Sequence, residues 1–78
     1  MKQIVYLNDS LIDFERASIS PNDRGFLFSD GVYEVVRCYD GYRFELERHL
    51  DRLQYGLREL RIADIDRSKL IEVSAELL

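Results

Sequence analysis

Arg52 is the residue whose type and position in the chain point most directly to chemistry. It falls on the flank of a predicted helix, one turn before Gly56, where a guanidinium could hold a phosphate through a charge-assisted, bidentate hydrogen bond. The alternative is an exposed arginine that pairs with Asp51, Gln54 or Glu59 on the same helix. Spacing alone favours this surface role.

Tyr33 and His49 are the other candidates for contact with a ligand. Tyr33 lies near the start of a predicted strand, where its hydroxyl could face a ligand or its ring could pack beneath a helix. The packed ring is the more ordinary role for such a tyrosine. His49 precedes Arg52 by three residues, and a helix-surface or supporting role is favoured over catalysis.

The remaining reactive side chains carry weaker signals. Cys38 has no evident base beside it, so the sequence favours a buried structural thiol over a nucleophile. One cysteine and one histidine are also a poor ligand set, and no metal site is predicted. Asp30, Glu34 and Glu45 could form a carboxylate pair, but their spacing fixes no separation, which favours solvated or salt-bridged roles.

The elements that position these side chains begin with a hairpin. Short apolar runs flank Asn8 and Asp9, residues that tolerate the positive φ of a tight turn, so we expect a β-hairpin over residues 3–14. A polar loop follows, in which Pro21 fixes φ and Ser20 can cap a single helical turn.

A second hairpin is predicted in the middle of the chain. Residues 32–39 are rich in β-branched and aromatic side chains, Asp40 and Gly41 form a two-residue turn, and residues 42–46 predict the returning strand. This register places Tyr39 opposite Tyr42. One face of the hairpin is the better candidate for covering by a helix or for facing a cavity. That face carries Tyr33, Val35, Arg37, Tyr39, Tyr42, Phe44 and Leu46.

The hydrophobic period then changes to that of a helix over residues 47–61. Four leucines recur at intervals of three and four and form one apolar stripe. His49, Arg52 and Gly56 form a second stripe beside it, and a glycine inside a helix costs about 1 kcal/mol relative to alanine. Close approach of another backbone or a ligand on that flank would explain the glycine. The leucines are Leu50, Leu53, Leu57 and Leu60.

A second amphipathic helix is predicted from Lys69 onward, preceded by a helix cap within residues 64–68. The pattern stops at Leu77 and Leu78 without a capping glycine or a polar end. We therefore expect the chain to be a fragment of a longer protein. Together these elements predict the α+β class, as a small two-layer domain of antiparallel β-hairpins packed with one or two amphipathic helices.

Composition limits the class of protein further. Residues 1–78 are enough for one small domain. The net charge of −4 and the lack of a basic run argue against nucleic acid as a partner. No signal peptide or membrane-spanning run is visible, and the single cysteine suits a reducing compartment, so we expect a cytoplasmic location.

Two motifs together resemble one known family. Residues 23–37 read Asp-Arg-Gly-Phe-Leu-Phe-Ser-Asp-Gly-Val-Tyr-Glu-Val-Val-Arg, and residues 47–53 read Glu-Arg-His-Leu-Asp-Arg-Leu. They resemble the N-terminal domain of the fold-type IV, class IV pyridoxal-phosphate-dependent aminotransferases, over nearly the whole chain. The Tyr33-Glu34-Val35 step is most like the D-amino-acid aminotransferase branch.

The resemblance implies a function and two site residues. Arg52 would bind the phosphate of pyridoxal 5'-phosphate, and Tyr33 would line the substrate pocket of an enzyme that transfers the amino group of a D-amino acid to a 2-oxo acid. It implies a homodimer, and a Schiff-base lysine that is expected beyond Leu78. No catalytic residue is therefore expected in this chain, which alone should be inactive.

Several alternatives stay open. Branched-chain aminotransferases, (R)-selective amine transaminases and aminodeoxychorismate lyases share the fold, and the Phe28-Ser29-Asp30 step also resembles the amine transaminases. A hypothesis of another class is a non-catalytic α+β module that binds an anion or dimerises. The reading frame after Leu78 would distinguish an enzyme segment from such a module.

Overall fold

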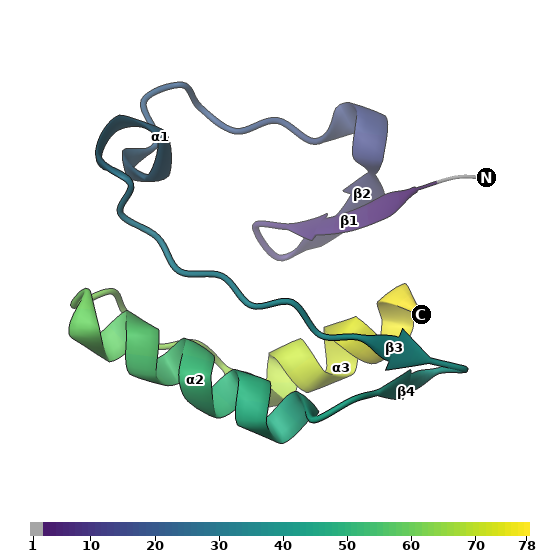
Figure 1. The fold of residues 1–78 in the computed structure, drawn as a ribbon. Helices are drawn as coiled ribbons and strands as arrows, with labels where there is room; N and C mark the ends of the chain where they lie inside the picture. The colour runs from purple at the N-terminus through teal and green to yellow at the C-terminus, as the bar shows by residue number, and fades with distance from the viewer. Residues whose placement is uncertain (1–2) are drawn as a thin grey trace.

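The computed structural model describes residues 3–78, so that Lys2, one of the two lysines, lies outside the described part. Two small antiparallel hairpins and several helices make up the chain (Figure 1), which confirms the predicted α+β class. The elements are β1 (Ile4–Leu7), β2 (Ser10–Asp13), the 3-10 helix η1 (Phe14–Arg16), α1 (Arg24–Phe28), β3 (Cys38–Tyr39), β4 (Tyr42–Arg43), α2 (Leu46–Glu59) and α3 (Arg67–Leu77).

The first hairpin forms where the sequence predicts it. Strands β1 and β2 pair antiparallel, with Leu7 opposite Ser10. The two turn residues, Asn8 and Asp9, have φ angles of 48° and 68°. These are left-handed conformations that asparagine and aspartate adopt at low cost, and they match the twist of a tight hairpin.

The loop after the first hairpin contains a short helix a few residues later than expected. Asp23 begins α1, because its side chain accepts a hydrogen bond of 2.8 Å from the backbone N–H of Gly25. Ser20 instead accepts one from the backbone N–H of Asn22, at 3.1 Å. Arg24 closes the far side of the loop with an Nε–Oδ2 hydrogen bond of 2.8 Å to Asp30.

The second hairpin has the predicted register but is much shorter than predicted. Tyr39 lies opposite Tyr42, and Asp40 and Gly41 have φ angles of 47° and 82°. Glu45 then takes a φ of 56°, which turns the chain directly into α2. One further pairing follows as predicted, since the backbone N–H of Phe44 donates to the carbonyl of Arg37 at 2.8 Å. The predictions of longer strands over residues 32–37 and 44–46 are otherwise wrong, because the returning chain leaves too early to pair with residues 32–36.

Residues 32–37 are nevertheless extended and run alongside α2 (Figure 1). Val32, Glu34 and Val36 are half-buried, whereas Tyr33 and Val35 between them are exposed. The segment keeps the side-chain alternation of a strand, although residues 32–36 pair with no strand of the described chain. The face predicted to be covered, the one with Tyr33, is thus the exposed one, and this expectation is wrong.

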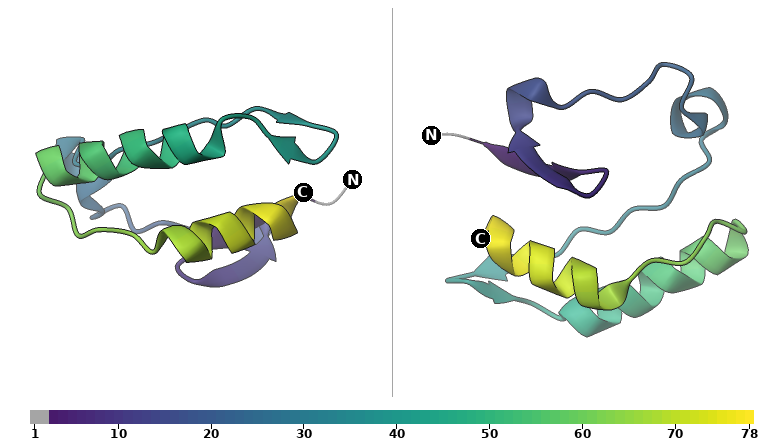
Figure 2. Two further views of the ribbon diagram at one scale, coloured as in Figure 1. Left: turned by 90° about the horizontal axis from the view of Figure 1, so that it is seen from below. Right: turned by 180° about the vertical axis from the view of Figure 1, so that it is seen from behind.

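Helix α2 carries the small hydrophobic core together with α3. Leu50 and Leu57 of the predicted stripe are buried with Val73 of α3, while Leu60 at the end of the stripe is exposed. Asp66 begins α3 by accepting a hydrogen bond from the backbone N–H of Lys69, which confirms the predicted cap. Helix α3 turns back past α2 and reaches the first hairpin, where it contacts β1 (Figure 2).

Two arginines connect these elements over long sequence distances. Arg67 at the start of α3 donates hydrogen bonds to Asp51 and Gln54 of α2, at 2.6 and 2.9 Å, and pairs with Glu47. Arg43 of β4 donates to the carbonyl of Ile71 and to Ser74, at 2.7 and 2.6 Å. With so few buried side chains, these contacts set how the second hairpin, α2 and α3 sit together.

In the part of the chain that the structure describes, no helix is both long and apolar enough to cross a lipid bilayer.

We expect Arg67→Ala to lower the midpoint of thermal unfolding by several degrees, because it removes the side chain that joins α3 to three residues of α2. Arg58→Ala is the matched control: Arg58 lies in the last turn of α2, is exposed, and makes none of these contacts. Circular dichroism measures the unfolding midpoint of each variant. Equal shifts in this midpoint for the two variants would show that Arg67 does not hold the helices together.

Candidate functional site

The candidate site is built around the carboxylate of Glu34, which meets two side chains of α2. Its Oε1 atom lies 2.6 Å from Nδ1 of His49 and accepts a hydrogen bond of 2.9 Å from Nη2 of Arg52. Its Oε2 atom accepts a second bond from Arg52, from Nε at 2.6 Å. An ionised carboxylate only accepts, so His49 presents a protonated Nδ1 to it.

The second stripe predicted on α2 is the surface on which the extended segment lies. His49 and Arg52 project from successive turns of α2 and both contact Glu34. One turn further on, a Cβ atom placed on Gly56 would lie 3.1 Å from Cγ1 of Val32. A close approach at Gly56 is therefore present, but it is made by the side chain of Val32 and not by a backbone or a ligand. Val32 packs into the space that a side chain at position 56 would fill.

The electrostatics of the cluster follow from these contacts. Only 11% of the Glu34 side chain is exposed. The hydrogen bonds from Arg52, and then those from His49, lower the pKa of Glu34 to about 2, against the opposing effect of its desolvation. The same contact raises the pKa of Arg52, and the pair is ionised at neutral pH.

Arg52 keeps one end of its guanidinium available for a ligand. Nε and Nη2 bind Glu34, whereas Nη1 makes no hydrogen bond to any residue from 3 to 78, and 72% of the side chain is exposed. Arg52 also lines a surface pocket of about 230 Å³. Arg48 and His49 line it too, which places a second guanidinium beside the first. Phe44 and Glu45 complete the lining.

The pocket has the chemistry of an anion site. Arg48 is paired only loosely, with Glu45 at 3.7 Å on an exposed surface, so its charge is free to act on the pocket. An arginine held on one edge and open on the other suits bidentate recognition of a phosphate or a carboxylate. The partners expected for Arg52 on the helix surface, Asp51, Gln54 and Glu59, are wrong, because its hydrogen bonds within residues 3–78 go to Glu34.

Tyr33 is not part of this cluster. It neighbours Glu34 on the extended segment, but alternation directs it to the other face, where 84% of it is exposed. No hydrogen bond joins its hydroxyl to any other described residue, and the alternative of a ring packed beneath a helix is wrong. The structure therefore brings together Glu34, His49 and Arg52, and leaves Tyr33 pointing into solvent.

The cysteine and the remaining carboxylates considered from the sequence lie outside the Glu34 cluster. Cys38 is exposed, so the expectation of a buried thiol is wrong; it lies in the two-residue strand β3, of which both residues are exposed. The salt-bridged role favoured for the carboxylates is correct: Asp30 pairs with Arg24 at 2.7 Å, and Glu45 with Arg48. Within residues 3–78, no cluster of three or more acidic, histidine or cysteine side chains could hold a metal ion.

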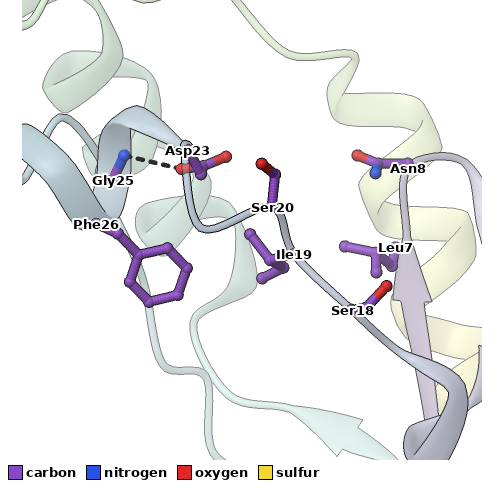
Figure 3. A pocket seen from close by; sticks show the side chains of 8 residues that line it. All are labelled: Leu7, Asn8, Ser18, Ile19, Ser20, Asp23, Gly25 and Phe26. Carbon is purple, nitrogen blue, oxygen red and sulfur yellow. Dashed lines mark hydrogen bonds between the residues drawn. The ribbon is translucent and has the colours of Figure 1, made fainter.

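A larger hollow of about 440 Å³ opens between the first hairpin and the loop that follows it (Figure 3). Two of its polar side chains are already engaged, since Ser20 bonds Asn22 and Asp23 bonds Gly25. None of its described lining residues is a lysine or an arginine, and Asp23 adds a negative charge. The lining residues are Leu7, Asn8, Ser18, Ile19, Ser20, Asp23, Gly25 and Phe26.

Sequence reasoning missed Glu34 as the partner of Arg52. The alternation of residues 32–37 places Glu34 on the same face as Val32, but the sequence interpretation favours the opposite face for covering by a helix. A helix stripe of His49, Arg52 and Gly56 is better matched by Glu34 and Val32 than by tyrosines. Polar complementarity between the two elements would have identified the contact.

Comparison with known proteins finds relatives along almost the entire chain. It is 39% identical over 75 residues to a protein of Methanocaldococcus jannaschii provisionally named branched-chain-amino-acid aminotransferase. It is 38% identical over 76 residues to a D-alanine aminotransferase of Staphylococcus haemolyticus, and 34% identical over 76 residues to the aminodeoxychorismate lyase of Bacillus subtilis. These matches cover 95%, 95% and 96% of the chain.

The chain spans about a quarter of the length of these curated relatives, at 26%, 27% and 26%. No protein-family model matches it. No solved structure matches it either. The three relatives carry different activities in their names, and together they confirm the resemblance to fold-type IV aminotransferases.

Because the pKa of Glu34 is lowered from 4.5 to about 2, its contacts stabilise the fold fully above pH 4.5, and this contribution is lost as the pH falls toward 2. We therefore expect Glu34→Gln to be less stable than the native chain at neutral pH, and the difference to shrink between pH 4.5 and 2. Denaturant titrations across this range measure it. A difference that stays constant with pH would contradict the ion-paired assignment of Glu34.

Proposed function

We propose that this chain, whose relatives support a fold-type IV aminotransferase domain, supplies one wall of the active site of a pyridoxal-phosphate-dependent transaminase. In this proposal the enzyme transfers the amino group of a D-amino acid to a 2-oxo acid. Arg52 binds the phosphate of the cofactor, and Tyr33 contacts the substrate. The observation that carries the proposal is that Arg52, whose Nη1 makes no hydrogen bond to any described residue, lines the same pocket as Arg48.

The residues around this pocket fit a phosphate monoester. Two guanidiniums supply charge and N–H donors, and the nearby carboxylate of Glu34 is already committed to His49 and to the far edge of Arg52. The site lies half open on the surface, as a wall completed by other parts of a longer protein would. Once bound, the cofactor supplies the electron sink for moving the amino group.

Within this chain the two proposed residues have separate tasks. Arg52 and Arg48 bind the phosphate and so orient the cofactor; they hold no proton that the reaction moves. Tyr33 presents its hydroxyl from the neighbouring position of the extended segment, where it is exposed and free to donate to a substrate carboxylate. The proton-transferring lysine is proposed to lie outside residues 1–78, so that the chain alone would not turn over substrate.

The choice of substrate rests on the Tyr33-Glu34-Val35 step, which is most like the D-amino-acid branch. The relatives include a lyase and a branched-chain aminotransferase at similar identity, and these are the competing activities. Consumption of D-alanine that depends on pyruvate would support the proposal, whereas release of 4-aminobenzoate from aminodeoxychorismate would favour the lyase. The proposal keeps the homodimer and the cytoplasmic location inferred from the sequence.

We expect Arg52→Ala in the full-length protein to weaken the affinity for pyridoxal 5'-phosphate by about ten- to a hundredfold, the worth of hydrogen bonds to a charged group. Equilibrium dialysis of the cofactor measures this. Arg58→Ala, at an exposed position on the same helix outside the pocket, is the control and should bind normally. If Arg52→Ala binds pyridoxal 5'-phosphate with unchanged affinity, Arg52 is not the residue that binds the cofactor phosphate.

We expect Tyr33→Phe to raise the KM for the amino acid by about two- to tenfold, because one hydroxyl donor to the substrate is lost, with cofactor affinity unchanged. Tyr42→Phe, at another exposed tyrosine, is the matched control. Steady-state kinetics with D-alanine decide the outcome: a native KM in Tyr33→Phe would exclude Tyr33 from substrate binding.

A further inference from the structure

We infer that Glu34 is a positioning residue, which sets the orientation of Arg52 so that the outer edge of its guanidinium faces the phosphate in the pocket. This inference rests on the proposed role of Arg52. It concerns a residue that would not touch the ligand, because both carboxylate oxygens of Glu34 are used within the chain.

The contact is side-on and two-pronged, which fixes a direction as well as a distance. Nε and Nη2 of Arg52 meet the two oxygens of Glu34 at 2.6 and 2.9 Å. A guanidinium is planar, so a bond on this edge also determines where Nη1 and the other hydrogen of Nη2 point. An arginine as exposed as Arg52 would otherwise sample several rotamers, and ordering it on binding would cost affinity.

Glu34 is itself firmly held, which makes it a suitable base for Arg52. His49 contacts the same Oε1 atom from the preceding turn of α2. On the extended segment, Val32 packs against Gly56 one turn beyond Arg52. The carboxylate is thus fixed by its own chain on one side and by α2 on the other, and Arg52 takes its orientation from both.

A simple counter-charge would act in the opposite direction, and this separates the two roles. A carboxylate beside an anion site repels the anion, so removing a negative charge that served no other purpose would strengthen phosphate binding. If Glu34 instead orients Arg52, its removal frees the guanidinium and weakens binding in spite of the gain in net positive charge. The sign of the change in affinity distinguishes the two roles.

The test compares the full-length protein with its Glu34→Gln and Glu34→Asp variants. For each, the dissociation constants of pyridoxal 5'-phosphate and of pyridoxal, which lacks the phosphate, are measured by equilibrium dialysis. Their ratio reports the phosphate alone, and a general loss of structure does not change it. We expect this phosphate preference to fall about tenfold in both variants, which corresponds to about 1.4 kcal/mol.

The two variants distinguish the effect of the negative charge at position 34 from the effect of the side-chain length. Glu34→Gln keeps the length of the side chain and removes the charge, whereas Glu34→Asp keeps the charge and shortens the side chain by one methylene. Glu45→Gln is the matched control, because Glu45 lines the same pocket but contacts only Arg48, at 3.7 Å. It should bind phosphate as well as the native protein or better, through the charge effect alone.

Each outcome decides one claim. A phosphate preference that is unchanged or increased in Glu34→Gln, with a loss in Arg52→Ala, would overturn the positioning role and leave Arg52 as the phosphate ligand. No loss in Arg52→Ala would overturn the role of Arg52 and this inference with it. Equal losses for pyridoxal and its phosphate would reduce Glu34 to a structural residue. In an Arg52→Ala background, Glu34→Gln should change the preference no further.

Discussion

The bridge from Glu34 to His49 and Arg52 is the contact on which the candidate site depends. Residues 32–36 pair with no strand of the described chain, and this carboxylate, together with the fit of Val32 against Gly56, holds them along α2. The same bridge orders an otherwise exposed arginine. Backbone placement and side-chain orientation are therefore coupled through a single ionised group, so that a change at Glu34 reaches both.

Arginine is the side chain that joins this small structure over long sequence distances. Arg43 connects the second hairpin to α3, Arg67 connects α3 to α2, and Arg52 connects α2 to the extended segment. Each uses several donors of one planar group, which a lysine could not do from a single point of charge. Among residues 3–78, only Leu50, Leu57 and Val73 form a buried hydrophobic core, so polar contacts carry much of the arrangement.

Patterns in the sequence predict the structural features that depend on residues close together in the chain. The turn at Asn8 and Asp9, the leucine period of α2 and the cap before α3 all depend on residues close in the chain, and all were predicted. The long second strand was not, because the backbone of Glu45 turns the returning chain into α2 before it can pair. Glu34 was not identified as the partner of α2 for a related reason. Alternation indicates the face on which Glu34 lies, but not which element that face contacts, and His49 and Arg52 lie 15 and 18 positions away.

The most direct test of this account is a crystal structure of the full-length protein with pyridoxal 5'-phosphate bound. We expect the phosphate within hydrogen-bonding distance of Nη1 of Arg52, with Nε and Nη2 still bound to Glu34 and no contact between Glu34 and the cofactor. A phosphate bound elsewhere, or an Arg52 that leaves Glu34 to reach it, would contradict the account.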